Sequence, residues 1–456
     1  MDIVFSSTTQ LAGMIQTRRV SAIEVLEAYL AQIESHNPSL NAIVTIDAEQ
    51  ARKRAQEADE ALARGELWGP LHGVPFTLKD CHSTAGMRTT AGFPKLADYI
   101  PQADSTVTAR LKAAGGILVG KTNVSELLVD IQSNNPIFGR TNNPWNVERT
   151  PGGSSGGAAA ALASGMIAFD VGSDLGGSIR LPAHWCGVFG LKPTENRVSL
   201  AGHIPEPPGS PRSVRLMAAI GPMARSIEDL ALLYAIIAGP DGRDMEVQPV
   251  PVDPVPSIEL KALRIAFAPT FADFPVSAEI RAAVEALAHQ LDSAGAVVEA
   301  ALPAVDFHQQ LSAGRALSEM MTGAFQRDSP EPPVTLAAYL EALHHRDQAI
   351  TAWERFFDAW DILVCPPSMT TAFPHCEEGS PLQVDGGAVE YWMGNAHCKI
   401  FNYTGHPAVV LPYKLDHDGL PIGIQIVGAR WDESRLLAIA KAITDITGKF
   451  QPPPGY

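Results

Sequence analysis

The feature that most constrains this chain is a glycine- and serine-rich stretch at residues 152–194, which reads GGSSGGAAAALASGMIAFDVGSDLGGSIRLPAHWCGVFGLKPT. A small-residue helix pattern at 156–164 separates two Gly/Ser turns, and an apolar strand pattern at 166–171 leads into the second turn. Glycine lets the backbone curve tightly and lets N–H groups approach a ligand. Two serine-bearing turns joined by one helix and one strand predict a site where the fold brings two hydroxyls together.

The motifs within this stretch resemble those of the amidase signature family. The matching segments are GGSSGG at 152–157, GSDLGGSIR at 172–180 and GLKPT at 190–194, and an upstream GVPFTLKD at 73–80 resembles the strand that carries the family's lysine. The resemblance covers almost the whole chain. Members of this family are hydrolases and amidotransferases that use a Ser–cis-Ser–Lys triad.

The resemblance implies that Ser178 is the nucleophile, that Ser154 follows a cis peptide bond and bridges the triad, and that Lys79 is the base. Amide hydrolysis needs an activated nucleophile, a proton for the departing amine and donors for the developing oxyanion. Lys79 must therefore be neutral at rest. An ordinary lysine titrates near ~10.4, and burial at the end of the apolar strand 74–78 is expected to lower its pKa.

The resemblance also implies the groups around the triad. Ser155 is expected to give hydrogen-bonding support, and Asp174 and Arg180 are expected to pair with each other rather than to contact the substrate. The backbone N–H groups of four consecutive residues are the expected oxyanion hole: Leu175, Gly176, Gly177 and Ser178.

Loops set specificity on a fixed scaffold, so the expected pocket walls are irregular segments. They are the segment around Ile131, Gln132, Ser133 and Asn134, the Pro-rich loop at 202–215, and residues 366–400.

Two rival motifs are rejected. Gly115 to Thr122 formally fits a Walker A motif, but its interior is Ile117-Leu118-Val119, which favours a buried strand over a phosphate-binding loop. The segment 153–157 fits G-x-S-x-G, but a nucleophile elbow needs a buried strand before it, and residues 146–151 are polar and end in proline.

Composition excludes several function classes. A net charge of −16 argues against unaided binding to nucleic acid. The first residues do not resemble a signal peptide, and no apolar run is long enough to span a membrane. Five cysteines without C-x-x-C spacing favour free thiols and a cytoplasmic location, and the adjacent His and Cys residues lack zinc-site spacing. We expect no metal, no cofactor, and a monomer or homodimer.

Alternating strand and helix patterns predict an α/β fold. Helices are expected within 8–36, 47–65, 105–114, 226–237, 277–294, 308–325, 335–360 and 433–448, and strands at 74–78, 116–120, 263–267, 297–301, 362–364, 408–412 and 422–427. The resemblance implies one large domain, 1–456, with a mixed central sheet covered by helices on both faces. Its N-terminal helical segment is 8–65, its core is 152–194, and 240–258 is an excursion.

The sequence thus predicts an amidohydrolase that cleaves the C–N bond of small apolar or aromatic amides through a Ser178 acyl-enzyme, with carbamate (urethane) and ester hydrolysis as side activities. The alternative is an amidotransferase A-type subunit that supplies ammonia from glutamine for tRNA-dependent transamidation. Such subunits carry YGRVSRYG after the signature, whereas residues 195–202 read ENRVSLAG. A non-catalytic protein with a decayed site is disfavoured because Lys79, Ser154 and Ser178 are all present.

Overall fold

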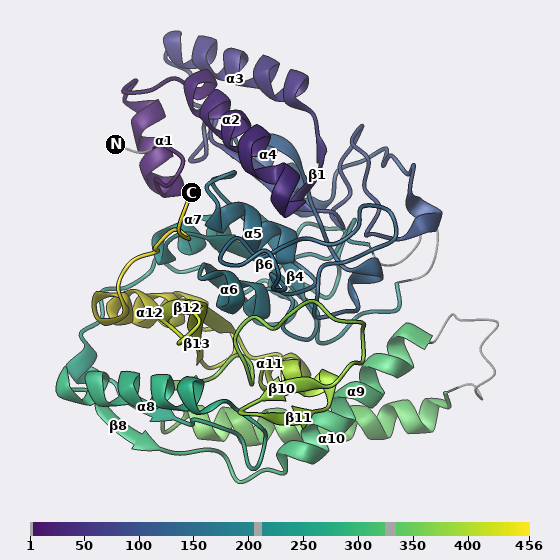
Figure 1. Cartoon of the computed structure of the whole chain (residues 1–456), viewed down its shortest axis with the longest axis vertical. Helices are drawn as coiled ribbons and strands as arrows, with labels where there is room; N and C mark the ends of the chain where they lie inside the picture. Colours follow the sequence, from purple (N-terminus) through teal and green to yellow (C-terminus); the bar gives the residue numbers. More distant parts are fainter. Residues whose placement is uncertain (1–2, 205–211, 324–333) are drawn as a thin grey trace.

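A single sheet runs through the computed structural model, which describes residues 3–204, 212–323 and 334–456 (Figure 1). Its eleven strands lie in the order β1-β3-β2-β4-β6-β5-β12-β13-β9-β7-β8, and β10 and β11 form a separate hairpin. The strands are β1 (Ile43–Ile46), β2 (Pro75–Lys79), β3 (Ile117–Thr122), β4 (Asp170–Asp174), β5 (Phe189–Lys192), β6 (Ala219–Ala224), β7 (Arg264–Phe267), β8 (Val297–Ala300), β9 (Ile362–Cys365), β10 (Leu382–Val384), β11 (Gly387–Val389), β12 (Ala408–Leu415) and β13 (Pro421–Val427).

The sheet is mixed, as the family resemblance implies. Strand β2 pairs in parallel with β3 and β4, and β7 pairs in parallel with β8 and β9, while the other pairings are antiparallel. In the β2–β4 pair, Thr77 lies opposite Asp170 and Leu78 opposite Val171. Because parallel strands end at the same edge, the residues that close β2 and β4 come together there.

Helices cover both faces of the sheet. Helices α5 and α6 pack against each other and on the central strands, while α7, α8 and α12 form a separate layer joined through α12. Figure 1 shows the two termini close together, and the rings of Phe5 and Phe450 stack with centroids 6.1 Å apart. The helices are α1 (Thr8–Gln16), α2 (Ala22–Leu40), α3 (Ala48–Ala63), α4 (Thr106–Ala113), α5 (Gly156–Ala163), α6 (Arg180–Cys186), α7 (Ile227–Ile237), α8 (Ala278–Ser293), α9 (Phe307–Gly323), α10 (Leu336–Phe357), α11 (Ala396–Tyr403) and α12 (Glu433–Thr447).

Helix α5 is the most deeply buried helix of the signature stretch, since every one of its residues is buried. Its small side chains let the backbone lie directly on neighbouring segments. A Cβ at Gly157 would collide with the backbone of Asn123, so only glycine fits there. This close approach fixes the position of the turn just before α5, which carries Ser154 and Ser155.

Two predictions for the signature region and its partner loop are wrong. A strand is expected at 166–171, but β4 begins only at Asp170. The carbonyl oxygens before it accept hydrogen bonds from side chains instead of from a neighbouring strand, because Arg225 donates to Ile167 O and Thr8 donates to Ala168 O. Residues 366–400 are not irregular throughout, since they contain the β10–β11 hairpin and the first turn of α11.

The remaining predicted helices and strands are present with small shifts at their ends. Strands β1, β5 and β6 and helices α6 and α11 were not predicted from the sequence. Residues 240–258 contain neither helix nor strand. Residues 205–211 of the Pro-rich loop and 324–325 of the helix expected at 308–325 lie outside the described residues.

No helix in the described part of the chain is long and apolar enough to cross a membrane. All five cysteines are thiols, and only Cys376 is partly exposed.

Candidate active site

Lys79 ends strand β2 and its side chain is completely buried. Its Nζ donates hydrogen bonds to Ser154 Oγ at 2.7 Å, to Ser173 Oγ at 3.1 Å and to Ser173 O at 3.2 Å. Burial lowers the pKa of Lys79 to about 8, because nearby acidic groups oppose the loss of water only in part. A substantial fraction of the lysine is therefore neutral near pH 8 and able to accept a proton.

The turn before α5 has the backbone geometry that the resemblance implies. The peptide bond between Gly153 and Ser154 is cis. Ser155 supports the second Gly/Ser turn through its backbone, because its N–H donates to Ser178 O at 3.2 Å. Its Oγ has no hydrogen-bond partner among the described residues. Ser154 and Ser155 are buried while Ser178 is half-buried. The serine expected to meet the substrate is thus the most accessible of the three.

The carboxylate of Asp174 holds the turn at 175–178 by hydrogen bonds to its backbone. The carboxylate of Asp174 accepts the N–H of Gly177 at 2.9 Å and that of Ile179 at 3.1 Å. The expectation that all four N–H groups of this turn face an oxyanion therefore needs a correction. The N–H of Gly177 is already bonded within the protein, and the candidate donors that remain are Leu175, Gly176 and Ser178.

Asp174 and Arg180 pair with each other, as expected. The guanidinium contacts both carboxylate oxygens, at 2.8 Å and 3.1 Å, and both side chains are fully buried. Burial alone would raise the pKa of Asp174, but the Arg180 charge holds it well below its usual range. Arg180 also donates to Cys398 O and to the side-chain oxygens of Gln425 and Asn402. The pair joins the turn at 175–178 to α11 and β13.

Ser173 is a site residue that the sequence analysis did not find. It supplies two of the three acceptors around the Lys79 amine. The signal was present in the sequence, because Ser173 lies in the second motif, near the end of a predicted strand. Only the parallel pairing of β2 with β4 shows that this residue comes to lie beside Lys79.

The expected pocket residues divide into different roles. Ser133 Oγ donates to Gly152 O at 2.9 Å and accepts the N–H of Gly156, so it braces the turn rather than facing a ligand. Ile131 is buried in an apolar cluster, and Gln132 donates to the Tyr391 hydroxyl at 2.9 Å. Asn134 is exposed. The segment therefore borders the turn, but its four members do not form one wall.

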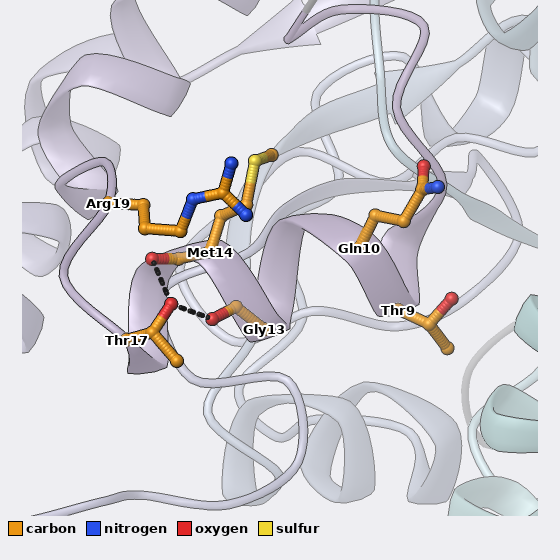
Figure 2. Close-up of a pocket in the computed structure, with 6 residues that line it drawn as sticks. All are labelled: Thr9, Gln10, Gly13, Met14, Thr17 and Arg19. Atoms are coloured by element: carbon orange, nitrogen blue, oxygen red, sulfur yellow. Dashed lines mark hydrogen bonds between the residues drawn. The ribbon is translucent and has the colours of Figure 1, made fainter. Parts of the chain in front are cut away.

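The hollow drawn in Figure 2 is not this site. It has a volume of about 380 Å³, is lined by the N-terminal helix α1, and contains no residue of the expected triad. Within it, Thr17 Oγ1 donates to Gly13 O at 2.7 Å. The lining residues are Thr9, Gln10, Gly13, Met14, Thr17 and Arg19.

Within residues 3–204, 212–323 and 334–456, no group of three or more His, Cys, Asp or Glu side chains is arranged to hold a metal ion.

Comparison with known proteins decides the family. The family model described as Amidase matches residues 24–331 and 325–437. The chain belongs to the amidase signature family. It is an amidohydrolase of that family and acts on C–N bonds.

Individual relatives of this family member include both hydrolases and amidotransferase subunits. The chain is 36% identical to the A-type subunit of the glutamyl-tRNA(Gln) amidotransferase of Synechococcus sp. (strain CC9605), with 93% of each chain covered. A solved bacterial aryl acylamidase of the amidase signature family is 26% identical with a TM-score of 0.83, covering 97% of this chain and 96% of that one. The solved A-type subunit of the Thermotoga maritima glutamyl-tRNA(Gln) amidotransferase is 25% identical with a TM-score of 0.81, covering 99% and 98%.

The Asp174–Arg180 pair gives a first prediction. Asp174→Asn should lower the free energy of unfolding by about 3–5 kcal/mol, because it leaves a buried guanidinium without its counter-charge. Glu27→Gln is the matched control, since Glu27 contacts Arg52 in the same two-oxygen manner on the surface and should leave stability nearly unchanged. Urea denaturation of both variants measures the difference. Equal effects would contradict a special role for the buried pair.

Proposed function

We propose that this chain hydrolyses a small carboxamide by acyl transfer to Ser178, with Lys79 as the base and Ser154 as the proton relay. One observation carries the proposal. The buried amine of Lys79, whose pKa is lowered, lies 2.7 Å from Ser154 Oγ. The turn that carries Ser154 is itself hydrogen-bonded to Ser178 O. A neutral amine with a hydroxyl in direct contact is the arrangement that general-base activation of a serine requires.

The proposed reaction has two halves. Ser178 Oγ attacks the carbonyl carbon while its proton passes to Ser154, whose own proton passes to Lys79. The same path then runs in reverse and protonates the leaving nitrogen as the C–N bond breaks, which leaves an acyl-enzyme. Water enters, loses a proton along the same path, and releases the acid with Ser178 restored.

The oxyanion formed in each half needs donors that are fixed in advance. The N–H groups of Leu175, Gly176 and Ser178 are the proposed donors. Asp174 supports them indirectly, because its bonds to the N–H groups of Gly177 and Ile179 hold the turn in one conformation.

Two substrate classes share this chemistry. The curated relatives favour an amidotransferase A-type subunit that takes ammonia from glutamine, and they support this alternative better than they support a free-standing amidase. The segment 195–202 and the similarity to the aryl acylamidase support a free-standing amidase, with carbamates and esters as further substrates. In the first case the chain would work with partner subunits and charged tRNA, and in the second case alone as a monomer or homodimer.

Substrate preference of the isolated chain separates the two classes. A free-standing amidase should hydrolyse nitroanilides, esters and carbamates without any partner subunit. The products measured are nitroaniline from the nitroanilides, the alcohol from the esters and the aryl amine from the carbamates. An amidotransferase subunit should release ammonia from glutamine only, at a rate that rises when partner subunits and charged tRNA are added. Ammonia release from glutamine and chromogen release from the other substrates are measured on one preparation. The ratio of the two rates shows which of the two substrate classes the chain prefers.

The nucleophile can be tested directly. Ser178→Ala and Lys79→Ala should each lower kcat by at least roughly 10³-fold while the thermal unfolding curve stays intact. A fluorophosphonate probe should add one label to the wild type and none to Ser178→Ala, as read by intact mass. Ser39→Ala is the matched control, because Ser39 is exposed on α2 and outside the site. Labelling of Ser178→Ala would assign the nucleophile elsewhere.

The lowered pKa of Lys79 predicts a pH profile. Protonated Lys79 cannot accept a proton, so kcat/KM for an uncharged amide should rise with pH through about 8 and then level off. The residual activity of Lys79→Ala should lack this rise. A flat wild-type profile, under conditions where acyl transfer limits the rate, would contradict a neutral lysine base.

A further inference from the structure

A carboxylate that the sequence analysis did not single out borders the site. Asp130 begins the segment that lies against the cis turn, and a Cβ at Gly153 would come within 2.6 Å of both Asp130 O and Gln132 O. Gly153 immediately precedes Ser154. The Asp130 backbone is therefore packed against the residue next to the proposed proton relay.

The side chain of Asp130 is held in place by neutral groups only. Its Oδ1 accepts the Tyr391 hydroxyl at 2.5 Å and the N–H of Ile131 at 2.7 Å. Gln132 Nε2 donates to the same Tyr391 hydroxyl at 2.9 Å and to Cys376 O at 2.9 Å, which fixes the tyrosine. No lysine, arginine or histidine of the described residues forms an ion pair with Asp130.

This lack of a counter-charge is unusual for a carboxylate in such surroundings. Burial raises the pKa of Asp130 to about 6, so the group is still ionised at neutral pH. Asp130 is half-buried, and holding an ionised group in such a place costs free energy unless a cation accompanies it. Asp174, the other carboxylate beside the turn at 175–178, has Arg180 as its partner. Asp130 has no such cationic partner among the described residues.

A second acceptor without a partner lies on the same structural element as Tyr391. The 3-10 turn η4 (Tyr391–Asn395) carries Tyr391 at its start and Asn395 at its end. Asn395 is only 5% exposed, its Oδ1 has no hydrogen-bond partner among the described residues, and its Nδ2 would lie 3.2 Å from a Cβ at Gly176. Buried side-chain oxygens are nearly always bonded, so Asn395 Oδ1 is available to accept a hydrogen bond from a bound molecule.

The η4 turn connects the two acceptors across the site. A Cβ at Gly394 would lie 3.0 Å from Ile131 Cδ1, so the turn packs on the segment that carries Asp130. Its far end touches Gly176, two residues before Ser178. Asp130 and Asn395 therefore border the proposed oxyanion turn and the cis turn, and each has acceptor capacity that the described protein donors leave open.

We propose that Asp130 is a specificity-determining residue that binds a protonated amine on the substrate, while Asn395 Oδ1 accepts an N–H of the same molecule. The inference rests on the proposed function and narrows its substrate class to amides that bear an ammonium group, such as amino-acid or ω-amino carboxamides. A wholly apolar amide would bury both acceptors unpaired, whereas an ammonium group supplies a charge and several donors.

Paired substrates test this assignment. Nitroanilides of ω-amino acids of increasing chain length are each compared with the uncharged alkyl nitroanilide of equal length, and a second series places the amine on the leaving group. Wild type should prefer one charged series by roughly 10- to 100-fold in kcat/KM, mainly through KM. In Asp130→Asn this ratio should fall to near one. Glu377→Gln is the matched control, because Glu377 is an exposed carboxylate in the neighbouring segment and its ratio should stay as in wild type.

Two further measurements separate the possible failures. Asp130→Ser replaces Asp130→Asn if the latter does not fold, and calorimetric binding of the charged and uncharged amides to Ser178→Ala gives the preference without turnover. Equal binding and equal kcat/KM for both members of every pair, or a ratio that Asp130→Asn leaves unchanged, would overturn the role of Asp130. If wild type hydrolyses no amide and Ser178 takes no label, the proposed function fails, and the binding preference still decides on Asp130.

Discussion

The site depends on the hydrogen bond between Lys79 Nζ and Ser154 Oγ. The sheet buries the lysine, and no carboxylate of the described residues contacts its amine. Strand β2 carries Lys79 out of a layer of fully buried residues, and its amine finds three oxygen acceptors from two serines. A carboxylate in contact would stabilise the ammonium form and raise the pKa. Serine oxygens instead orient the amine and leave burial to lower its pKa to about 8. The rest of the site surrounds an amine that has serine oxygens, and no carboxylate, in contact with it.

Three buried or half-buried aspartates around the site show how hydrogen-bond donors and charges in contact set the pKa of a carboxyl group. Asp170 accepts only hydroxyl and N–H groups, from Thr77, Thr122 and the Lys79 backbone, and burial raises its pKa to about 7. Asp174 has the Arg180 charge in contact and stays ionised. Asp130 has neutral donors and, in the described part of the chain, no cation. Asp170 thus supports the ends of β2, β3 and β4, and Asp174 fixes the oxyanion turn. Asp130 is the carboxylate that we propose to bind a charged ligand.

The close packing of α5 explains why the signature is so rich in small residues. Serines 154 and 155 stand at the start of a helix whose every residue is buried, and a Cβ at Gly157 would collide with the backbone of Asn123. The turn that holds Ser154 thus has little freedom to move relative to β2 and β4. A hydrogen-bonded relay needs this rigidity, because its distances must hold within a few tenths of an ångström.

From the sequence by itself, local periodicity predicted an α/β fold and most helices and strands, and the resemblance of its motifs to a known family implied the family and the mixed sheet. The resemblance indicated Lys79, Ser154 and Ser178 as one set from two separate motifs, 73–80 and 152–180, and the second motif also contains the Asp174–Arg180 pair. Only the tertiary structure decided that Ser173 lies beside Lys79, that Asp174 occupies the N–H of Gly177, and that Asp130 and Asn395 border one site. Each of these depends on strand pairing or on contacts between residues as many as 261 positions apart, such as Tyr391 and Asp130. Sequence patterns carry no direct record of such contacts, because the side chains meet only after the sheet has formed.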